Sequence, residues 1–143
     1  MPKSMVVDAN VIAKWILSGE PYEDNALRLK EDMVNRSVIL HSPDLLLSEL
    51  GNIFWKASKK SRISNDNAIR ALGILSTMNI VLHSLRWEET IESLHSAIEL
   101  DLTVYDASYL YLGKALGASV LTGDEKLWKS AKEKYDVTHL KDY

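Results

Sequence analysis

Short runs of apolar and β-branched residues alternate with longer segments of helical periodicity along the whole chain. Strands are predicted at residues 4–8, 37–41, 79–83, 118–122 and 137–140. Helices are predicted at residues 9–17, 22–35, 44–60, 65–77, 86–100, 104–116 and 125–134. Strands that alternate with helices pair in parallel, because each helix carries the chain back across the sheet. We therefore expect an α/β fold of three layers (α/β/α), with a central, mainly parallel sheet of four to five short strands.

The composition is that of a single globular domain. The chain has 143 residues and no linker or low-complexity segment, so residues 1–143 are predicted to form one domain. No apolar run is as long as a membrane span, and the N-terminus enters a predicted strand without a signal-peptide pattern. The absence of cysteine excludes disulfides, thiolate metal sites and cysteine nucleophiles. We expect a cytoplasmic protein that does not associate with membranes.

Acidic residues stand at the ends of two predicted strands. Asp8 closes the first strand, and Asp124 follows the strand at residues 118–122 after one glycine. If the two strands are parallel, both carboxylates lie at the carboxyl edge of the sheet, where such folds bind ligands. Two carboxylates held together need a cation or a proton between them. Because oxygen ligands select hard cations, this pattern predicts a site for Mg²⁺ or Mn²⁺ rather than for zinc.

Each candidate acid also has a purely structural explanation. Asp8 and Asp124 each precede a predicted helix and are suitable N-caps. Asp106 stands three residues after Thr103, which is the spacing of a capping box. Glu49 lies at the margin of an apolar helix stripe and can be a solvated rim charge. These alternatives stay open, and capping is compatible with a site because helix N-termini commonly face such clefts.

Four short segments with acidic residues follow one another along the chain: Val6–Asn10, Leu47–Asn52, Thr103–Leu110 and Leu121–Leu127. In this order, on an alternating α/β pattern, they resemble the PIN-domain family, and within it the VapC-type toxins of toxin–antitoxin pairs. The resemblance implies a PIN-like fold and a metal-dependent ribonuclease. It also implies an RNA substrate, a cognate antitoxin protein and a homodimer.

The resemblance assigns catalysis and metal binding to an acidic quartet, formed by Asp8, Glu49, Asp106 and Asp124. Asn10 and Thr122 match the polar positions that help to arrange the site in the family. The quartet is expected to hold one or two Mg²⁺ or Mn²⁺ ions, which activate a water to attack the phosphorus in line. Two alternatives remain: a catalytically silent PIN-like module that binds RNA or protein, and a metal-dependent nuclease that acts on DNA.

Nucleic-acid binding must rely on local basic patches, because the formal net charge is -3. One patch lies in a stretch without acidic residues and consists of Lys56, Lys59, Lys60 and Arg62. A second cluster is interrupted by acids and consists of Lys126, Lys129, Lys132 and Lys134. Each cluster is also typical of a solvated helix end. We expect the first patch to contact RNA.

The histidines are not predicted to be catalytic. His41 and His83 end two predicted strands and are able to approach the same cleft, and the other two histidines are His95 and His139. No pair has the helical spacing of metal ligands. We interpret them as polar strand-end residues.

Overall fold

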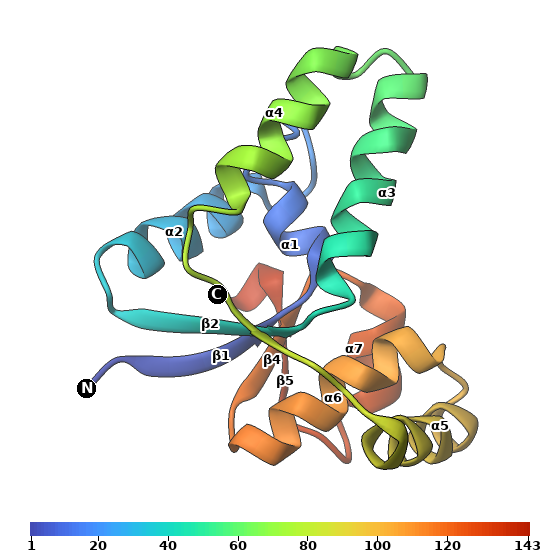
Figure 1. Cartoon of the computed structure of the whole chain (residues 1–143). Coiled ribbons are helices and arrows are strands. Elements are labelled where there is room, and N and C mark those ends of the chain that lie inside the picture. Colours follow the sequence, from blue (N-terminus) through green and yellow to red (C-terminus); the bar gives the residue numbers. More distant parts are fainter.

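The computed structural model describes all 143 residues as a central sheet with helices on both faces (Figure 1). The strands are β1 (Lys3–Val7), β2 (Val38–Pro43), β3 (Val81–His83), β4 (Ser119–Thr122) and β5 (Val137–His139). They form a 5-stranded sheet in the order β3-β2-β1-β4-β5, and every neighbouring pair is parallel. The predicted three-layer parallel architecture is confirmed, with five strands.

The helices that connect the strands are α1 (Ala9–Ala13), α2 (Glu23–Val34), α3 (Leu46–Lys59), α4 (Asn65–Leu75), α5 (Trp87–Leu100), α6 (Val104–Leu116) and α7 (Glu125–Ala131), followed by the short η1 (Leu140–Asp142). Figure 1 shows α1 to α4 on one side of the sheet and α5 and α6 on the other. None of these helices is both long enough and apolar enough to span a membrane.

Alternate side chains of the central strands enter two separate hydrophobic cores. Met5 and Val7 of β1 belong to the core that contains the apolar faces of α1 to α4. Val6 of β1 and Val120 of β4 belong to the second core, with α6 and α7. A strand that alternates its side chains between two buried faces must be apolar at every position, which explains the continuous apolar run at the start of the chain.

Helix α6 packs very closely on β4, as its nearly continuous apolar sequence predicts. A side chain at Gly113 would place its Cβ 2.6 Å from Cγ2 of Val120 and 2.9 Å from the carbonyl oxygen of Ala118. Gly117 ends the helix in the left-handed region, with a φ of 62°. Gly113 thus allows the close approach of α6 to β4. Gly117 sets where α6, the helix that carries Asp106, ends.

The strand order places the acidic edge at a topological switch point. From β1 the chain first builds β2 and β3 on one side, and later adds β4 and β5 on the other. The connections on either side of β1 therefore leave the sheet in opposite directions, and ligands of open α/β sheets bind at this crevice. Asp8 follows β1 directly, and Asp124 follows β4, its neighbour in the sheet.

Several predicted boundaries were wrong. The helix predicted for residues 9–17 ends at Ala13, because the next N–H groups bond to carbonyls three residues back and form tight turns. The strand predicted for residues 37–41 extends to Pro43, and the helix predicted for residues 44–60 begins at Leu46. The pairing with β3 continues past Pro43, because the Asp44 N–H donates to the His83 carbonyl at 2.9 Å.

Candidate active site

Asp8 is the buried centre of the candidate site. Its side chain is 5% exposed and comes directly after β1. The residue occupies the N-cap position of α1, but its side chain makes no capping hydrogen bond. Instead, Oδ2 accepts hydrogen bonds from the Thr122 hydroxyl at 2.8 Å and from Nδ2 of Asn10 at 2.9 Å. The capping explanation for Asp8 was therefore wrong.

Thr122 and Asn10 connect the ends of β1 and β4. The Thr122 hydroxyl, which donates to Asp8, also accepts the backbone N–H of Asp124 at 3.0 Å. Oδ1 of Asn10 accepts the backbone N–H of Gly123 at 2.9 Å. The two polar residues predicted to support the site thus tie the Asp124 loop to Asp8. A side chain at Gly123 would crowd this contact, since its Cβ would lie 3.0 Å from Asn10 Oδ1.

Asp124 caps α7 and faces the same edge. Its Oδ1 accepts the backbone N–H groups of Lys126 at 2.9 Å and Leu127 at 3.2 Å. The predicted N-cap role is confirmed, and it involves only one of the two carboxylate oxygens. Capping fixes the side chain while Oδ2 accepts no hydrogen bond from the protein.

Glu49 is held by a tyrosine that the sequence analysis did not identify. Oε1 of Glu49, in the first turn of α3, accepts a hydrogen bond of 2.5 Å from the Tyr109 hydroxyl. Tyr109 is fully buried on α6, three residues after Asp106 and therefore on the same face of that helix. The sequence signal for Tyr109 was its position three residues after Asp106. The apolar residues around Tyr109 indicated a core residue instead.

Asp106 lies in the first turn of α6. Its backbone N–H donates to the Thr103 hydroxyl at 3.1 Å, which confirms Thr103 as the N-cap. The reciprocal half of a capping box, from the Asp106 carboxylate to the Thr103 backbone, does not form. The carboxylate of Asp106 is therefore not required for capping.

The four acids share one electrostatic environment. Burial raises the pKa of the Asp8 carboxyl to about 7; the Thr122 hydrogen bond opposes this, and the charges of Glu49, Asp106 and Asp124 add to it. Burial also raises the pKa of Glu49, with a contribution from Asp106. The pKa of Asp106 is raised by burial and by Asp124. The cluster thus favours protons or a cation over four bare charges.

No basic residue neutralises this cluster by direct contact. The ion pairs of the chain are Arg62–Glu20, Lys129–Glu125, Lys134–Glu99 and His139–Glu125, and none includes the quartet. Asp8, Glu49 and Asp124 each engage protein donors through one oxygen only. The remaining oxygens are hard donors, which is the donor set that Mg²⁺ and Mn²⁺ prefer.

The four acidic side chains do not converge on a single point. Nowhere in the chain do three or more acidic or histidine side chains converge tightly enough to surround an ion. The donor chemistry fits a divalent cation, and movement of the half-buried carboxylates would have to accompany binding. Asp8 is the most firmly fixed of the four, because it alone is buried and it also accepts two hydrogen bonds.

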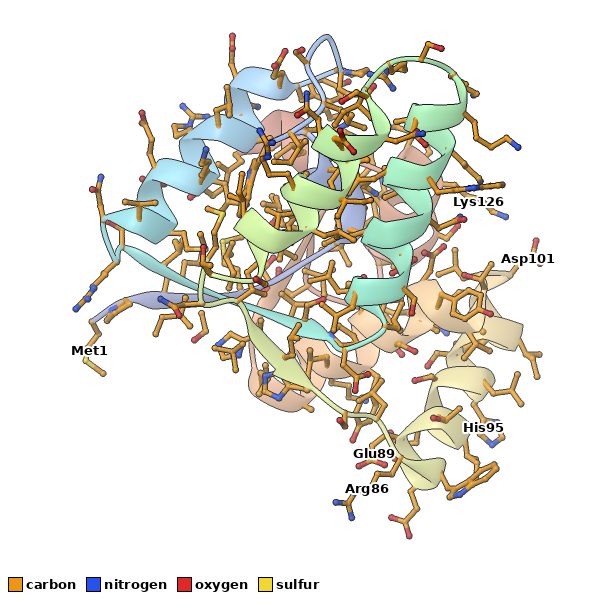
Figure 2. The ribbon with its side chains drawn as sticks, turned by 45° about the horizontal axis from the view of Figure 1, so that its top comes forward. Met1, Arg86, Glu89, His95, Asp101 and Lys126 are labelled. Carbon is orange, nitrogen blue, oxygen red and sulfur yellow. The ribbon has the colours of Figure 1, made fainter.

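Two lysines lie nearer to the quartet than the predicted basic patch. The exposed Lys126 lowers the pKa of Asp106, in opposition to the larger effect of burial (Lys126 is labelled in Figure 2). Cε of Lys14 lies 3.4 Å from the position that a Cβ at Gly123 would take. In the predicted patch, Arg62 pairs with Glu20 at 3.4 Å. The lysines of the patch stand at the opposite end of α3 from Glu49: Lys56, Lys59 and Lys60.

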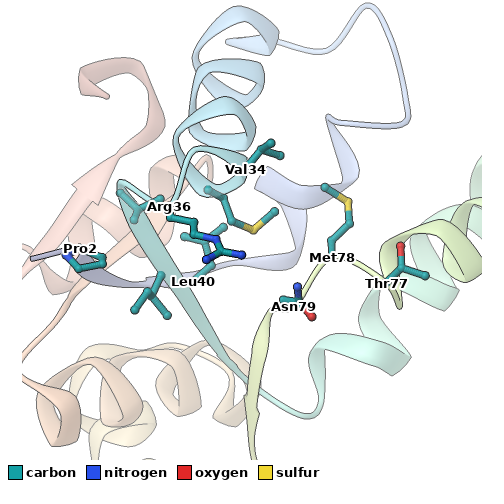
Figure 3. A pocket seen from close by; sticks show the side chains of 10 residues that line it. Pro2, Val34, Arg36, Leu40, Thr77, Met78 and Asn79 are labelled. Atoms are coloured by element: carbon teal, nitrogen blue, oxygen red, sulfur yellow. The ribbon is translucent and has the colours of Figure 1, made fainter.

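A pocket of about 540 Å³ lies away from the acids (Figure 3). Apolar side chains such as Met33, Val38 and Met78 line it, together with Arg36 and Asn79. None of the quartet contributes to its walls. The candidate site is consequently the acidic edge at the switch point, and not this hollow.

The chain is similar to a known protein family and to two ribonuclease or exonuclease relatives. Residues 5–133 match the PIN domain family. Ribonuclease VapC3 of Pyrobaculum aerophilum is 30% identical over 124 residues, which cover 86% of this chain and 91% of that protein. Exonuclease VapC9 of the same organism is 31% identical over 141 residues, which cover 98% of this chain and 95% of that protein.

Solved structures have the same fold. A crystal structure of a Pyrobaculum aerophilum protein superposes with a TM-score of 0.70 at 25% sequence identity, covering 99% of this chain and 91% of that one. VapBC2 from Rickettsia felis, solved with a DNA fragment from its promoter, superposes with a TM-score of 0.66 at 14% identity, covering 95% and 98%. At 14% identity, the second likeness concerns the fold alone.

Proposed function

The chain belongs to the PIN-domain family of VapC ribonucleases, and from this membership we propose that it is a Mg²⁺- or Mn²⁺-dependent endoribonuclease, active as the toxin of a toxin–antitoxin pair. The observation that supports metal dependence most strongly is the buried Asp8 carboxylate. It lies among three further acids, has a raised pKa and has no basic partner. The family match over residues 5–133 supports one nuclease domain.

The residues of the site divide into metal ligands and supports. In this proposal the metal ligands are the four acids Asp8, Glu49, Asp106 and Asp124. A bound cation would supply Lewis acidity to a water and positive charge opposite the scissile phosphate. Thr122 and Asn10 hold Oδ2 of Asp8 and leave Oδ1 without a hydrogen bond from the protein. Tyr109 holds Glu49 in the same way through Oε1.

The RNA backbone needs positive charge beside the acids, because phosphate and carboxylates repel one another. Lys126 and Lys14 stand next to Asp106 and Gly123, and we assign them to the phosphates nearest the cut. The patch that begins with Lys56 and Lys59 at the far end of α3 would contact the strand further away. Helix α3 has Glu49 in its first turn and these two lysines in its last turn.

A homodimer is the second part of the proposal, and helix α5 supports it. Its exposed face carries an apolar stripe at helical spacing: Trp87, Ile91, Leu94 and Ile98. Figure 2 shows Arg86 and Asp101 at opposite ends of this helix. If two copies of α5 pair in antiparallel orientation, the apolar stripes face each other. An isologous interface of this kind is self-complementary. Family membership further supports a cognate antitoxin.

Cleavage of labelled RNA tests the catalytic proposal. A single-stranded RNA labelled at one end should be cut internally with Mg²⁺ or Mn²⁺, and not with EDTA. Asp8→Asn should lower the rate at least about 100-fold, because it removes a ligand and not merely a support. Asp101→Asn, which changes an exposed acid at the end of α5, is the matched control.

The same assay separates the alternatives. Cleavage of a DNA strand of the same sequence, with RNA left intact, would make the protein a DNA-directed nuclease. Binding of RNA without cleavage of either strand, at every metal concentration, would make it a silent binding module. Equal cleavage rates for Asp8→Asn and the unmodified chain would show that Asp8 is not part of the catalytic site.

A further inference from the structure

Two imidazoles meet at an edge of the sheet, outside the acidic quartet. His41 lies within β2 and His83 is the last residue of β3, the edge strand. Their ring centroids are 5.2 Å apart, and Nδ1 of His41 lies 3.0 Å from Nε2 of His83. Both side chains are half-buried. The pairing of Pro43 with His83 places the two histidines on the same face, because positions 41 and 43 of one strand share a face.

The second nitrogen of His41 has a partner that determines which atoms face His83. Nε2 of His41 lies 3.3 Å from the Ser4 hydroxyl oxygen on β1, which is able to accept its proton. With the proton on Nε2, Nδ1 carries a lone pair directed at His83. His83 then donates from Nε2 in the metal-free protein. If its proton moves to Nδ1, two lone pairs face the same point.

We propose that His41 and His83 form a two-nitrogen site for a borderline transition-metal ion, with Zn²⁺ as the reference ion. Two nitrogens bound at about 2.05 Å to a tetrahedral ion are about 3.3 Å apart. The distance of 3.0 Å between Nδ1 and Nε2 needs only a small adjustment to reach that value. Water completes the coordination. Imidazole selects Zn²⁺, Ni²⁺ and Cu²⁺, whereas the oxygen donors of the quartet select Mg²⁺ and Mn²⁺.

Local support for the site comes from three strands. With the proton on Nε2 of His41, the Ser4 hydroxyl oxygen on β1 accepts this hydrogen bond and raises the basicity of Nδ1, as partners of metal-bound histidines do. β3 has only three residues, and its Val81 and Leu82 are exposed, so the edge strand is held mainly by its pairing with β2. An ion shared by His41 and His83 connects β3 to β2, and Zn²⁺ should therefore raise the melting temperature.

Calorimetric titration with Zn²⁺ tests the site in a full-length chain whose acidic edge carries Asp8→Asn and Asp124→Asn. This background should still bind Zn²⁺. Adding His83→Gln should weaken Zn²⁺ binding at least about 10-fold, since it removes one of two ligands. His95→Gln is the matched control, because His95 is exposed on α5 (Figure 2), and it should leave the affinity unchanged. Absence of Zn²⁺ binding in the background, or equal affinity after His83→Gln, would overturn the proposal.

A second measurement uses the unmodified chain and so does not depend on the folding of any variant. Zn²⁺ should change the imidazole nitrogen resonances of His41 and His83 and leave those of His95 in place. Changes at His95 with none at the pair would contradict the site. Because neither readout involves RNA cleavage, the outcome is independent of the proposed nuclease function.

Discussion

The Tyr109 hydroxyl donates a hydrogen bond of 2.5 Å to Oε1 of Glu49 and so joins helix α6 to helix α3. Tyr109 is fully buried, and burial together with the charge of Asp8 and the bond to Glu49 keeps the pKa of its hydroxyl above the usual range. The hydroxyl therefore remains a neutral donor at every physiological pH. Glu49 is oriented without a positive charge, which leaves its own charge available to a cation.

Tyr109→Phe tests this relationship. The substitution removes only the hydroxyl, so the free energy of unfolding should fall by about 1 kcal/mol. RNA cleavage should fall by roughly 10-fold or more, because Glu49 loses the donor that orients it. Tyr105→Phe on the same helix is the control, since Tyr105 is exposed. A loss of stability with unchanged cleavage would reduce Tyr109 to a structural role.

The metal-free protein should lose stability as the pH rises. Burial raises the pKa of Asp8 from 3.8 to about 7 on folding, so between these values the folded state binds more protons than the unfolded state. The contribution of Asp8 is thus most favourable below about pH 4 and is lost as the pH rises through about 7. Asp8→Asn should remove this dependence and raise metal-free stability at pH 8 by roughly 1–4 kcal/mol.

Urea unfolding with EDTA at pH 5 and pH 8 measures this effect. The unmodified chain and the Asp101→Asn control should both be less stable at pH 8, whereas Asp8→Asn should show a smaller difference. Mg²⁺ should restore the stability of the unmodified chain at pH 8, because a cation favours the charged carboxylate. An identical pH dependence in Asp8→Asn would show that another group is responsible.

Neutralising the far end of α3 should change the salt dependence of RNA binding. The triple substitution of Lys56, Lys59 and Lys60 by Gln should lower the slope of log affinity against log salt by about 2, if each contacts a phosphate of single-stranded RNA. Arg62→Gln should have little effect, because Arg62 already pairs with Glu20. Filter binding with the Asp8→Asn chain measures binding without cleavage. An unaltered slope in the triple variant would make these lysines a solvated helix end.

The apolar stripe of α5 should determine the oligomeric state. The unmodified chain should be a dimer by light scattering, and Ile91→Glu with Ile98→Glu should give a monomer, because burying four carboxylates at one interface is unfavourable. Ile74→Glu changes an exposed isoleucine on α4 and is the matched control. Dissociation by Ile74→Glu alone, or a monomeric unmodified chain, would place the interface elsewhere or exclude it.

Part of the site could be predicted from local patterns. Asp8 and Asp124 follow short apolar runs, and a parallel sheet necessarily brings such strand ends to one edge. The order of β1 and β4 as neighbours was not readable from the sequence, but the shared edge does not depend on it. Glu49 and Asp106 lie on helices, whose packing depends on distant residues. Only the resemblance to the family brought them to the site, and the charges felt by Asp8 now support that placement.

Other features were missed for physical reasons. Tyr109 lies in an apolar helix, where a phenol ring indicates core packing, and its hydroxyl partner is 60 positions away in the sequence. The contact between His41 and His83 depends on the register of two strands separated by two helices. Periodicity predicts that strands exist and does not predict their register. Contacts between side chains on neighbouring strands could therefore not be predicted from the sequence.

Calorimetric titration with Mn²⁺ tests the central claim most directly, which is that the acids at the switch point form a metal site. The unmodified chain should bind Mn²⁺ near pH 8, and Asp8→Asn with Asp124→Asn should abolish the heat of binding, while Asp101→Asn should leave it unchanged. At pH 6, where Asp8 is still protonated in the metal-free protein because its pKa is raised, binding should also release protons. Equal Mn²⁺ affinity in the double variant and the unmodified chain would contradict the account.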